Sequence, residues 1–119
     1  MKKTLVLGAS DKPQRYSYLA VKKLRDHGHT VVAVGKKNAY IDDVEIVTGI
    51  PGHTDIDTLT LYLNPTNQKP YYESILALQP KRIIFNPGSE NPELEALAKG
   101  KGIETLEACT LVMLATNLY

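Results

Sequence analysis

The sequence contains a single cysteine, Cys109, no tryptophan and no long apolar run. A lone cysteine excludes an internal disulfide framework and is typical of a protein kept in a reducing cytoplasm. The 119 residues carry 14 basic and 13 acidic side chains, so no excess charge indicates nucleic acid or a membrane surface as a partner. No stretch has the pattern of a signal peptide or the length of a membrane helix. We therefore expect one cytoplasmic domain, residues 1–119.

Short apolar segments alternate with segments of helical periodicity, which is typical of a parallel sheet with helices on both faces. Five segments are apolar almost throughout, as expected for strands buried on both faces. These predicted strands are Thr4–Leu7, Thr30–Val34, Leu59–Leu63, Arg82–Phe85 and Ile103–Leu106. The predicted helices are about Ser17–His27, about Thr66–Leu78, one that starts at Pro92 behind an Asn91 cap, and about Thr110–Ala115. The sequence thus predicts an α/β domain with a five-stranded, mostly parallel sheet, and an irregular crossover over residues 38–57.

The first predicted strand runs directly into a Gly-x-Ser turn formed by Gly8, Ala9 and Ser10, and a helix follows. A strand that ends in glycine and opens a helix directs backbone N–H groups and a positive dipole end at one point, where nucleotides place their pyrophosphate. The dinucleotide motif Gly-x-Gly-x-x-Gly is incomplete, because Ser10 and Pro13 replace its second and third glycines. The turn therefore indicates a nucleotide without indicating NAD.

The second predicted strand ends in Gly35, Lys36 and Lys37, where an NAD site requires an acidic residue for the ribose 2′-hydroxyl. Two cations at this place suit an additional phosphate on the ribose, either the 2′-phosphate of NADP or the 3′-phosphate of coenzyme A (CoA). A solvated basic turn is the alternative. The residues alone leave open a CoA-binding domain and a small NADP-dependent oxidoreductase or redox-sensing module.

Asparagine–proline turns follow the third and fourth predicted strands, at Asn64-Pro65 and at Asn86-Pro87-Gly88. Both lie at the carboxyl ends of strands, where ligands bind in parallel α/β sheets. Asparagine, proline and glycine are also the common residues of ordinary turns. Two such turns on one edge of the sheet favour a ligand rim.

Candidate catalytic residues are few. His27 and His29 precede the second strand, at the edge opposite the expected ligand, and His53 with Asp55 nearby reads as a loop histidine. Cys109 starts the last helix, where a helix dipole can activate a thiol, but burial as a small apolar residue is the favoured interpretation. No residues have metal-ligand spacing or the pattern of paired catalytic carboxylates. We assign no catalytic or metal-binding residue.

Several blocks of the whole chain resemble the small bacterial CoA-binding proteins, which are stand-alone relatives of the CoA-binding domain of the succinyl-CoA synthetase α subunit. The most specific matching blocks are Asn86–Asn91 and Ala108–Leu114. The other matching residues are Gly8–Ser10, Arg15, Ser17, His27–Gly28, Asp57, Leu61–Leu63 and Ile84–Phe85.

This resemblance implies a Rossmann-like, three-layer α/β/α domain with CoA or an acyl-CoA across the carboxyl edge of the sheet. It implies phosphate contacts at the Gly8–Ser10 turn and Arg15, and a 3′-phosphate near Lys37. Val34, Tyr62 and Pro87 would then line the adenine and pantetheine path. Together with residues of the two asparagine–proline turns, these residues make up the predicted site. It consists of Gly8, Ala9, Ser10, Arg15, Ser17, Val34, Lys36, Lys37, Tyr62, Asn64, Pro87 and Gly88.

We therefore predict CoA or acyl-CoA binding without catalysis, with the NADP-dependent oxidoreductase or redox-sensing module as the alternative. A third possibility is a subunit whose catalytic residues come from a partner protein. The apolar stretch Leu111–Leu114 and the terminal Leu118 and Tyr119 could instead support a homodimer.

Overall fold

The computed structural model describes residues 1–52 and 55–119. The elements are β1 (Thr4–Ala9), α1 (Tyr16–Asp26), β2 (Val31–Gly35), β3 (Ala39–Ile41), β4 (Val44–Val47), β5 (Thr58–Leu61), α2 (Pro65–Gln68), the 3₁₀ helix η1 (Lys69–Tyr71), α3 (Tyr72–Leu78), β6 (Arg82–Phe85), α4 (Pro92–Gly100), β7 (Glu104–Glu107) and α5 (Thr110–Ala115). No helix in this part of the chain is long and apolar enough to cross a membrane.

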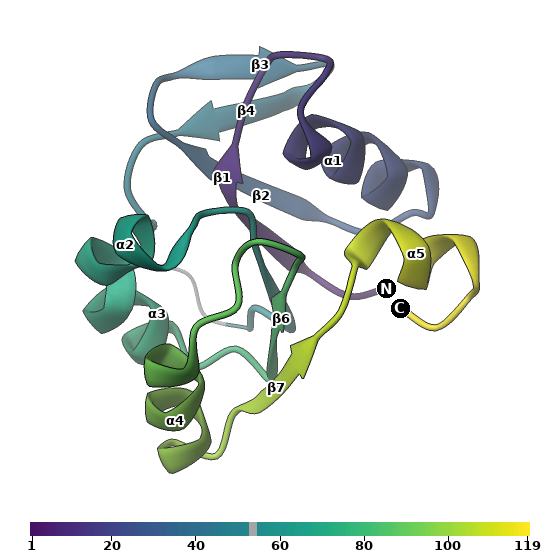
Figure 1. The fold of residues 1–119 in the computed structure, drawn as a ribbon. Helices are drawn as coiled ribbons and strands as arrows, with labels where there is room; N and C mark the ends of the chain where they lie inside the picture. Colours follow the sequence, from purple (N-terminus) through teal and green to yellow (C-terminus); the bar gives the residue numbers. More distant parts are fainter. Residues whose placement is uncertain (53–54) are drawn as a thin grey trace.

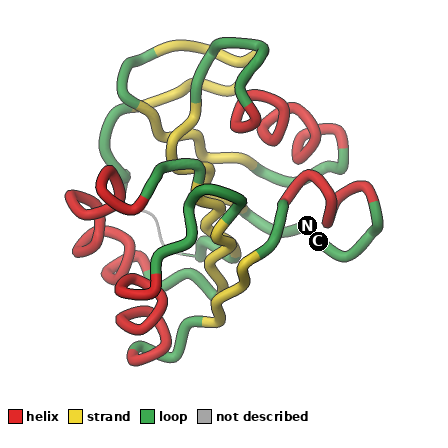
Figure 2. The backbone as a smooth tube through the Cα atoms, viewed as in Figure 1, coloured by secondary structure: helices red, strands yellow, loops and turns green. Residues whose placement is uncertain are grey.

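The described strands form one sheet in the order β3-β4-β2-β1-β5-β6-β7. Neighbouring strands are parallel except for β3 and β4, which form an antiparallel hairpin. Helices α1 and α5 pack on one face, and α2, α3 and α4 lie on the other (Figures 1 and 2). The structure thus confirms a three-layer, Rossmann-like α/β fold with a mostly parallel sheet.

The prediction of five strands was wrong, because the sheet has seven strands in the described chain. The two additional strands, β3 and β4, lie in the segment predicted to be an irregular crossover. They have three and four residues and join through a turn at Asp42, whose φ is 52°. The alternation of buried Val44 and Ile46 with exposed Glu45 is a strand pattern, but over four residues it is too short to be distinguished from a loop.

The core lies on both faces of the central strands. In β1, Leu5 and Leu7 pack on the α3–α4 face, while Val6 and Ala9 pack on the α1–α5 face. All four side chains are at most 7% exposed. Burial on both faces explains why the central strands are continuous apolar runs.

The structure confirms the predicted start of α4, where the Asn91 side chain accepts hydrogen bonds from the N–H groups of Glu93 and Leu94. The predicted helix from Thr66 to Leu78 is instead divided into α2, η1 and α3. Pro70 lies in the 3₁₀ turn, because proline has no N–H to donate to a continuous α-helix. The three short helices together follow the end of β5.

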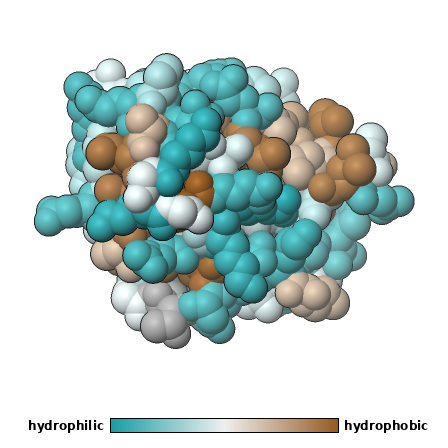
Figure 3. Space-filling view, turned by 90° about the horizontal axis from the view of Figure 1, so that it is seen from below, coloured by the Kyte–Doolittle hydropathy of each residue, from teal (hydrophilic) through white to brown (hydrophobic). Residues whose placement is uncertain are grey.

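Apolar side chains are exposed on and beyond α5. Val112 is 58% exposed and Leu118 is 72% exposed. The space-filling view shows hydrophobic residues over this helix, at the right (Figure 3). They belong to the segment from which the sequence suggests self-association.

Candidate functional site

A cavity of about 830 Å³ opens at the carboxyl ends of the central strands. Its walls come from the β1–α1 turn, the β2–β3 turn and the loops that follow β5 and β6. Every residue of the predicted site lines this cavity except Val34. Val34 is fully buried in the core on the α3–α4 face of the sheet, so the structure does not bring it to the cavity.

Gly8 allows the end of β1 to pass close under the loop after β5. Its φ is +98°, a conformation that glycine adopts at little cost. A Cβ at this position would lie 3.0 Å from the backbone carbon of Tyr62 and 3.1 Å from the Leu63 side chain. The glycine therefore brings the turn and the β5 loop together as adjoining walls of the cavity.

The N-terminus of α1 faces this turn without a side-chain cap. Arg15 is the N-cap residue, has an extended backbone and makes no capping hydrogen bond. The first N–H groups of a helix have no acceptor within the helix, so here they can donate to an acceptor on a ligand. Ser17, in the first turn of α1, is only 4% exposed and also lines the cavity. Free N–H groups and a positive dipole end together make an anion site.

Cations surround this anion site. Lys12 and Arg15 come from the β1–α1 turn, and Lys36 and Lys37 come from the β2–β3 turn. The one carboxylate among the described lining residues is that of Asp11, whose Oδ1 lies 3.8 Å from Nζ of Lys37. This ion pair connects the two turns across the mouth of the cavity.

Gly35 sets the distance between the two turns. The pairing register of β1 with β2 shifts between Leu7 and Ala9, where Ala9 faces Gly35. A Cβ on Gly35 would lie 2.3 Å from the carbonyl oxygen of Ala9, closer than real atoms approach. Glycine therefore permits the close approach that places Lys36 beside the Gly8–Ser10 turn.

Asn86, which the sequence suggested for the ligand rim, is 2% exposed and does not line the cavity. Its Nδ2 donates to Oγ1 of Thr60 at 2.7 Å and to the carbonyl of Leu61 at 2.8 Å. Its Oδ1 accepts from the backbone N–H of Thr110 at 2.9 Å. Asn86 therefore joins β5, β6 and α5 and supports the cavity from below.

A second buried network joins the loops after β5 and β6. Nε2 of Gln68 donates to the carbonyls of Leu63 and Ser89, each at 2.8 Å. Nδ2 of Asn91 donates to Oε1 of Gln68, also at 2.8 Å. Because these buried amides are fully paired, they hold the backbone of Pro87–Ser89 in place along the cavity wall.

The lining includes residues that sequence reasoning missed. Asp11 and Lys12 extend the predicted turn, and Asn67, Pro70 and Tyr71 come from the divided helix segment. The signal for Asp11 and Lys12 was their position between Ser10 and the helix. The last three could not be found, because a continuous helix was predicted there.

Tyr62 forms an aromatic wall. Its hydroxyl is buried and makes no hydrogen bond with the described residues. Burial raises the pKa of the Tyr62 phenol well above its usual value, and the nearby Cys109 thiol adds to the rise. The phenol is therefore neutral at physiological pH. Cys109 itself is partly exposed at the N-cap of α5 and does not line the cavity.

The described histidines lie before β2, at the opposite edge of the sheet from the cavity. His27 is exposed, and Nδ1 of His29 accepts from the backbone N–H of Lys2 at 3.0 Å. Burial is the main cause that lowers the pKa of His29. His53 lies outside the described residues. Within residues 1–52 and 55–119, no group of three or more His, Cys, Asp or Glu could hold a metal ion.

A sequence model of the family described as CoA binding domain matches residues 2–115. The chain belongs to this family. A comparison with curated proteins finds no match. CoA binding in general is therefore supported by the family as well as by the cavity.

Solved structures share the fold of this CoA-binding domain. The crystal structure of an uncharacterized protein is 48% identical, with a TM-score of 0.97 over 100% of this chain and 98% of that one. A hypothetical protein from Pyrococcus horikoshii OT3 is 24% identical, with a TM-score of 0.87 over 98% of this chain and 83% of that one. The structure of cell-free ID.343 from Thermus thermophilus is 25% identical, with a TM-score of 0.84 over 99% and 90%.

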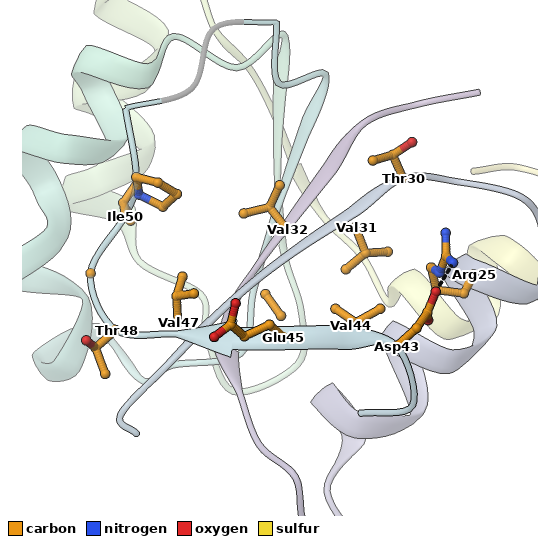
Figure 4. A pocket seen from close by; sticks show the side chains of 13 residues that line it. Arg25, Thr30, Val31, Val32, Asp43, Val44, Glu45, Val47, Thr48 and Ile50 are labelled. Atoms are coloured by element: carbon orange, nitrogen blue, oxygen red, sulfur yellow. Dashed lines mark hydrogen bonds and ion pairs between the residues drawn. The ribbon is translucent and has the colours of Figure 1, made fainter. Parts of the chain in front are cut away.

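The CoA-binding domain has another hollow, of about 650 Å³, where β2 and β4 diverge (Figure 4). Val32 and Val47 line it, and the Arg25–Asp43 ion pair, 2.7 Å long, lies at one end. No cluster of cations faces this hollow among its described lining residues, because Arg25 is already paired with Asp43. The cavity at the carboxyl edge is therefore the better candidate for a phosphate-bearing ligand.

Proposed function

We propose that this chain binds CoA or an acyl-CoA in the cavity at the carboxyl edge and catalyses no reaction of its own. The diphosphate would lie at the Gly8–Ser10 turn, and the 3′-phosphate would lie beside Lys36 and Lys37. The observation that carries the proposal is that an uncapped helix N-terminus and four cationic side chains converge on one part of a single cavity.

The phosphates of CoA are opposite in charge to this part of the cavity. The first N–H groups of α1 suit a diphosphate, because they need an acceptor and lie at the positive end of the helix dipole. Lys36 and Lys37 leave the sheet on the adjacent strand, where the ribose end of a nucleotide lies in such folds. Charge-assisted contacts from several of these side chains add together, and each contributes more where the bound ligand excludes water.

The same lining supports binding without catalysis. Among the described lining residues, Asp11 carries the one carboxylate, and this carboxylate is paired with Lys37. The Tyr62 phenol stays neutral because burial raises its pKa. Neither group is a base poised to take a proton near neutral pH. Recruitment of a catalytic partner protein is compatible with this role.

A second candidate is the binding of NADP by an oxidoreductase or redox-sensing module. Lys36 and Lys37 favour it, since the 2′-phosphate of NADP would also meet the end of β2. Hydride transfer would require a catalytic arrangement, which the described lining does not present. Ligand preference separates the two functions.

The test is thermal unfolding of the purified chain with CoA, dephospho-CoA, NAD or NADP, each at the same concentration. A ligand present at one hundred times its Kd adds about 2.7 kcal/mol to the free energy of unfolding. We expect CoA to raise Tm most and dephospho-CoA to raise it less. A response to NADP alone would transfer the assignment to the second candidate, and no response to CoA would refute CoA binding.

Two variants of α1 locate the site. Arg15→Ala removes a cation at the cavity, and Arg25→Ala removes the same charge near the other end of the helix. Both side chains are exposed, so both variants should fold. We expect Arg15→Ala to weaken CoA binding by about tenfold, which corresponds to about 1.4 kcal/mol. Equal losses in the two variants would show that only overall charge matters.

A further inference from the structure

Charge divides the cavity into two parts. Every charged side chain among its described lining residues comes from the β1–α1 or the β2–β3 turn. The lining from the β5 and β6 loops carries no charge, and we call it the neutral end. The neutral end consists of Tyr62–Asn64, Asn67, Pro70–Tyr71 and Pro87–Ser89.

The neutral end is where the thiol of a bound CoA would lie. All phosphates of CoA belong to its nucleotide half, and the pantetheine arm extends from the diphosphate to the thiol. If the phosphates occupy the cationic part, the arm must follow the rest of the cavity along Tyr62 and Asn64 toward Tyr71. An acyl group carried by the thiol therefore enters the neutral end.

The neutral end offers amides and apolar surfaces. Asn64 and Asn67 are exposed, and their side chains can pair with amide or thioester groups. Pro70 and Tyr71 provide apolar area. Lys69, which directly precedes Pro70 in the sequence, is not among the lining residues. A carboxylate at this end would lose part of its hydration without a cation to replace it.

Glu90 makes the neutral end still less suitable for an anion. Its carboxylate accepts a hydrogen bond from the N–H of Gly88 at 2.8 Å. A backbone N–H of the cavity wall is thereby occupied by a negative group, and that group would repel a second carboxylate. The Gly88 N–H would otherwise be a natural donor to an anionic ligand.

We propose that this site prefers an uncharged acyl group, so that acetyl-CoA and butyryl-CoA bind more tightly than a dicarboxylic thioester such as succinyl-CoA. The proposal rests on CoA binding at the carboxyl edge. It extends that function by naming the class of acyl-CoA from the charge of the neutral end.

The test compares dissociation constants of the full chain for CoA, acetyl-CoA, butyryl-CoA and succinyl-CoA by titration calorimetry. We expect acetyl-CoA and butyryl-CoA to bind at least as tightly as CoA. Succinyl-CoA should bind about fivefold more weakly than butyryl-CoA, which corresponds to about 1 kcal/mol.

Three variants assign the discrimination to the neutral end. Asn67→Lys places a cation on the lining, and Thr66→Lys places the same charge on the adjacent exposed residue outside it. Glu90→Gln removes the carboxylate and keeps an acceptor for Gly88. We expect Asn67→Lys and Glu90→Gln to reduce the preference for butyryl-CoA over succinyl-CoA. Thr66→Lys should leave it unchanged.

The outcomes separate this inference from the proposed function. If none of the four ligands binds, CoA binding itself fails, and the acyl preference fails with it. If CoA binds and succinyl-CoA binds as tightly as butyryl-CoA, only the acyl preference is overturned. Equal affinity for all four ligands would overturn it in the same way, because the acyl group would then extend into solvent.

Discussion

Substitution of Asp11 by asparagine should tighten CoA binding. The Asp11 carboxylate lies 3.8 Å from the Lys37 ammonium group. A ligand phosphate that approaches Lys37 must compete with this carboxylate and is also repelled by it. An asparagine at this position would keep the size of the side chain and remove both effects.

The magnitude follows from the distance and the exposure of the pair. The Lys37 side chain is 70% exposed and that of Asp11 is 35% exposed, so water screens their interaction strongly. Two unit charges about 4 Å apart in bulk water interact by about 1 kcal/mol, and exposed pairs usually contribute less. We therefore expect Asp11→Asn to lower the Kd for CoA by about two- to fivefold.

The assay is calorimetric titration of wild type and Asp11→Asn with CoA and with dephospho-CoA at low ionic strength. Both ligands carry the diphosphate, so the substitution changes its repulsion by Asp11 equally for both. Any larger gain in affinity for CoA than for dephospho-CoA therefore comes from the 3′-phosphate. This excess should shrink when Lys37 is replaced by alanine in both proteins, because only the direct repulsion between Asp11 and the 3′-phosphate then remains. Equal gains for the two ligands would refute the placement of the 3′-phosphate beside Lys37.

Two further predictions concern the scaffold. Gly35→Ala should lower the free energy of unfolding by about 1–3 kcal/mol in urea titrations, because its Cβ would lie 2.3 Å from the Ala9 carbonyl oxygen. Gly100→Ala, where nothing lies within 4 Å, should not destabilise the chain. His29 has a lowered pKa, so its neutral form stabilises the fold above about pH 6.5, and that contribution is lost as the pH falls below 6.5 toward the folded-state pKa. The stability difference between wild type and His29→Gln should therefore shrink from pH 8 to pH 5, and a constant difference would contradict it.

The sequence predicted the parts of the fold that local pattern determines. The apolar runs gave β6 at Arg82–Phe85 with its correct bounds, and the Asn91-Pro92 pair gave the start of α4. The hairpin of β3 and β4 could not be predicted, because strands of three and four residues depend on pairing with each other and with β2. Pairing between distant segments leaves little signal in a short stretch of sequence.

For the site, the sequence predicted the glycine turn and the two lysines, since both follow directly from strand ends. The structure does not bring Val34 to the cavity, because Val34 still pairs in regular register with Leu7 and packs in the same core cluster as Leu5 and Leu7. The sequence alone could not predict that Asp11 pairs with Lys37. Such contacts between turns are set by the distance between β1 and β2.

The two asparagines of the Asn-Pro-Gly-Ser-Glu-Asn block show why a specific motif need not touch the ligand. Asn86 is 2% exposed and Asn91 is 5% exposed, and both bind other parts of the chain. Replacement of either would leave buried donors or acceptors unpaired, at about 1–3 kcal/mol each. Of the residues between them, Pro87, Gly88 and Ser89 line the cavity. The block therefore specifies the shape of the wall, while the charges that we propose distinguish one ligand from another lie in Asp11, the lysines and Glu90.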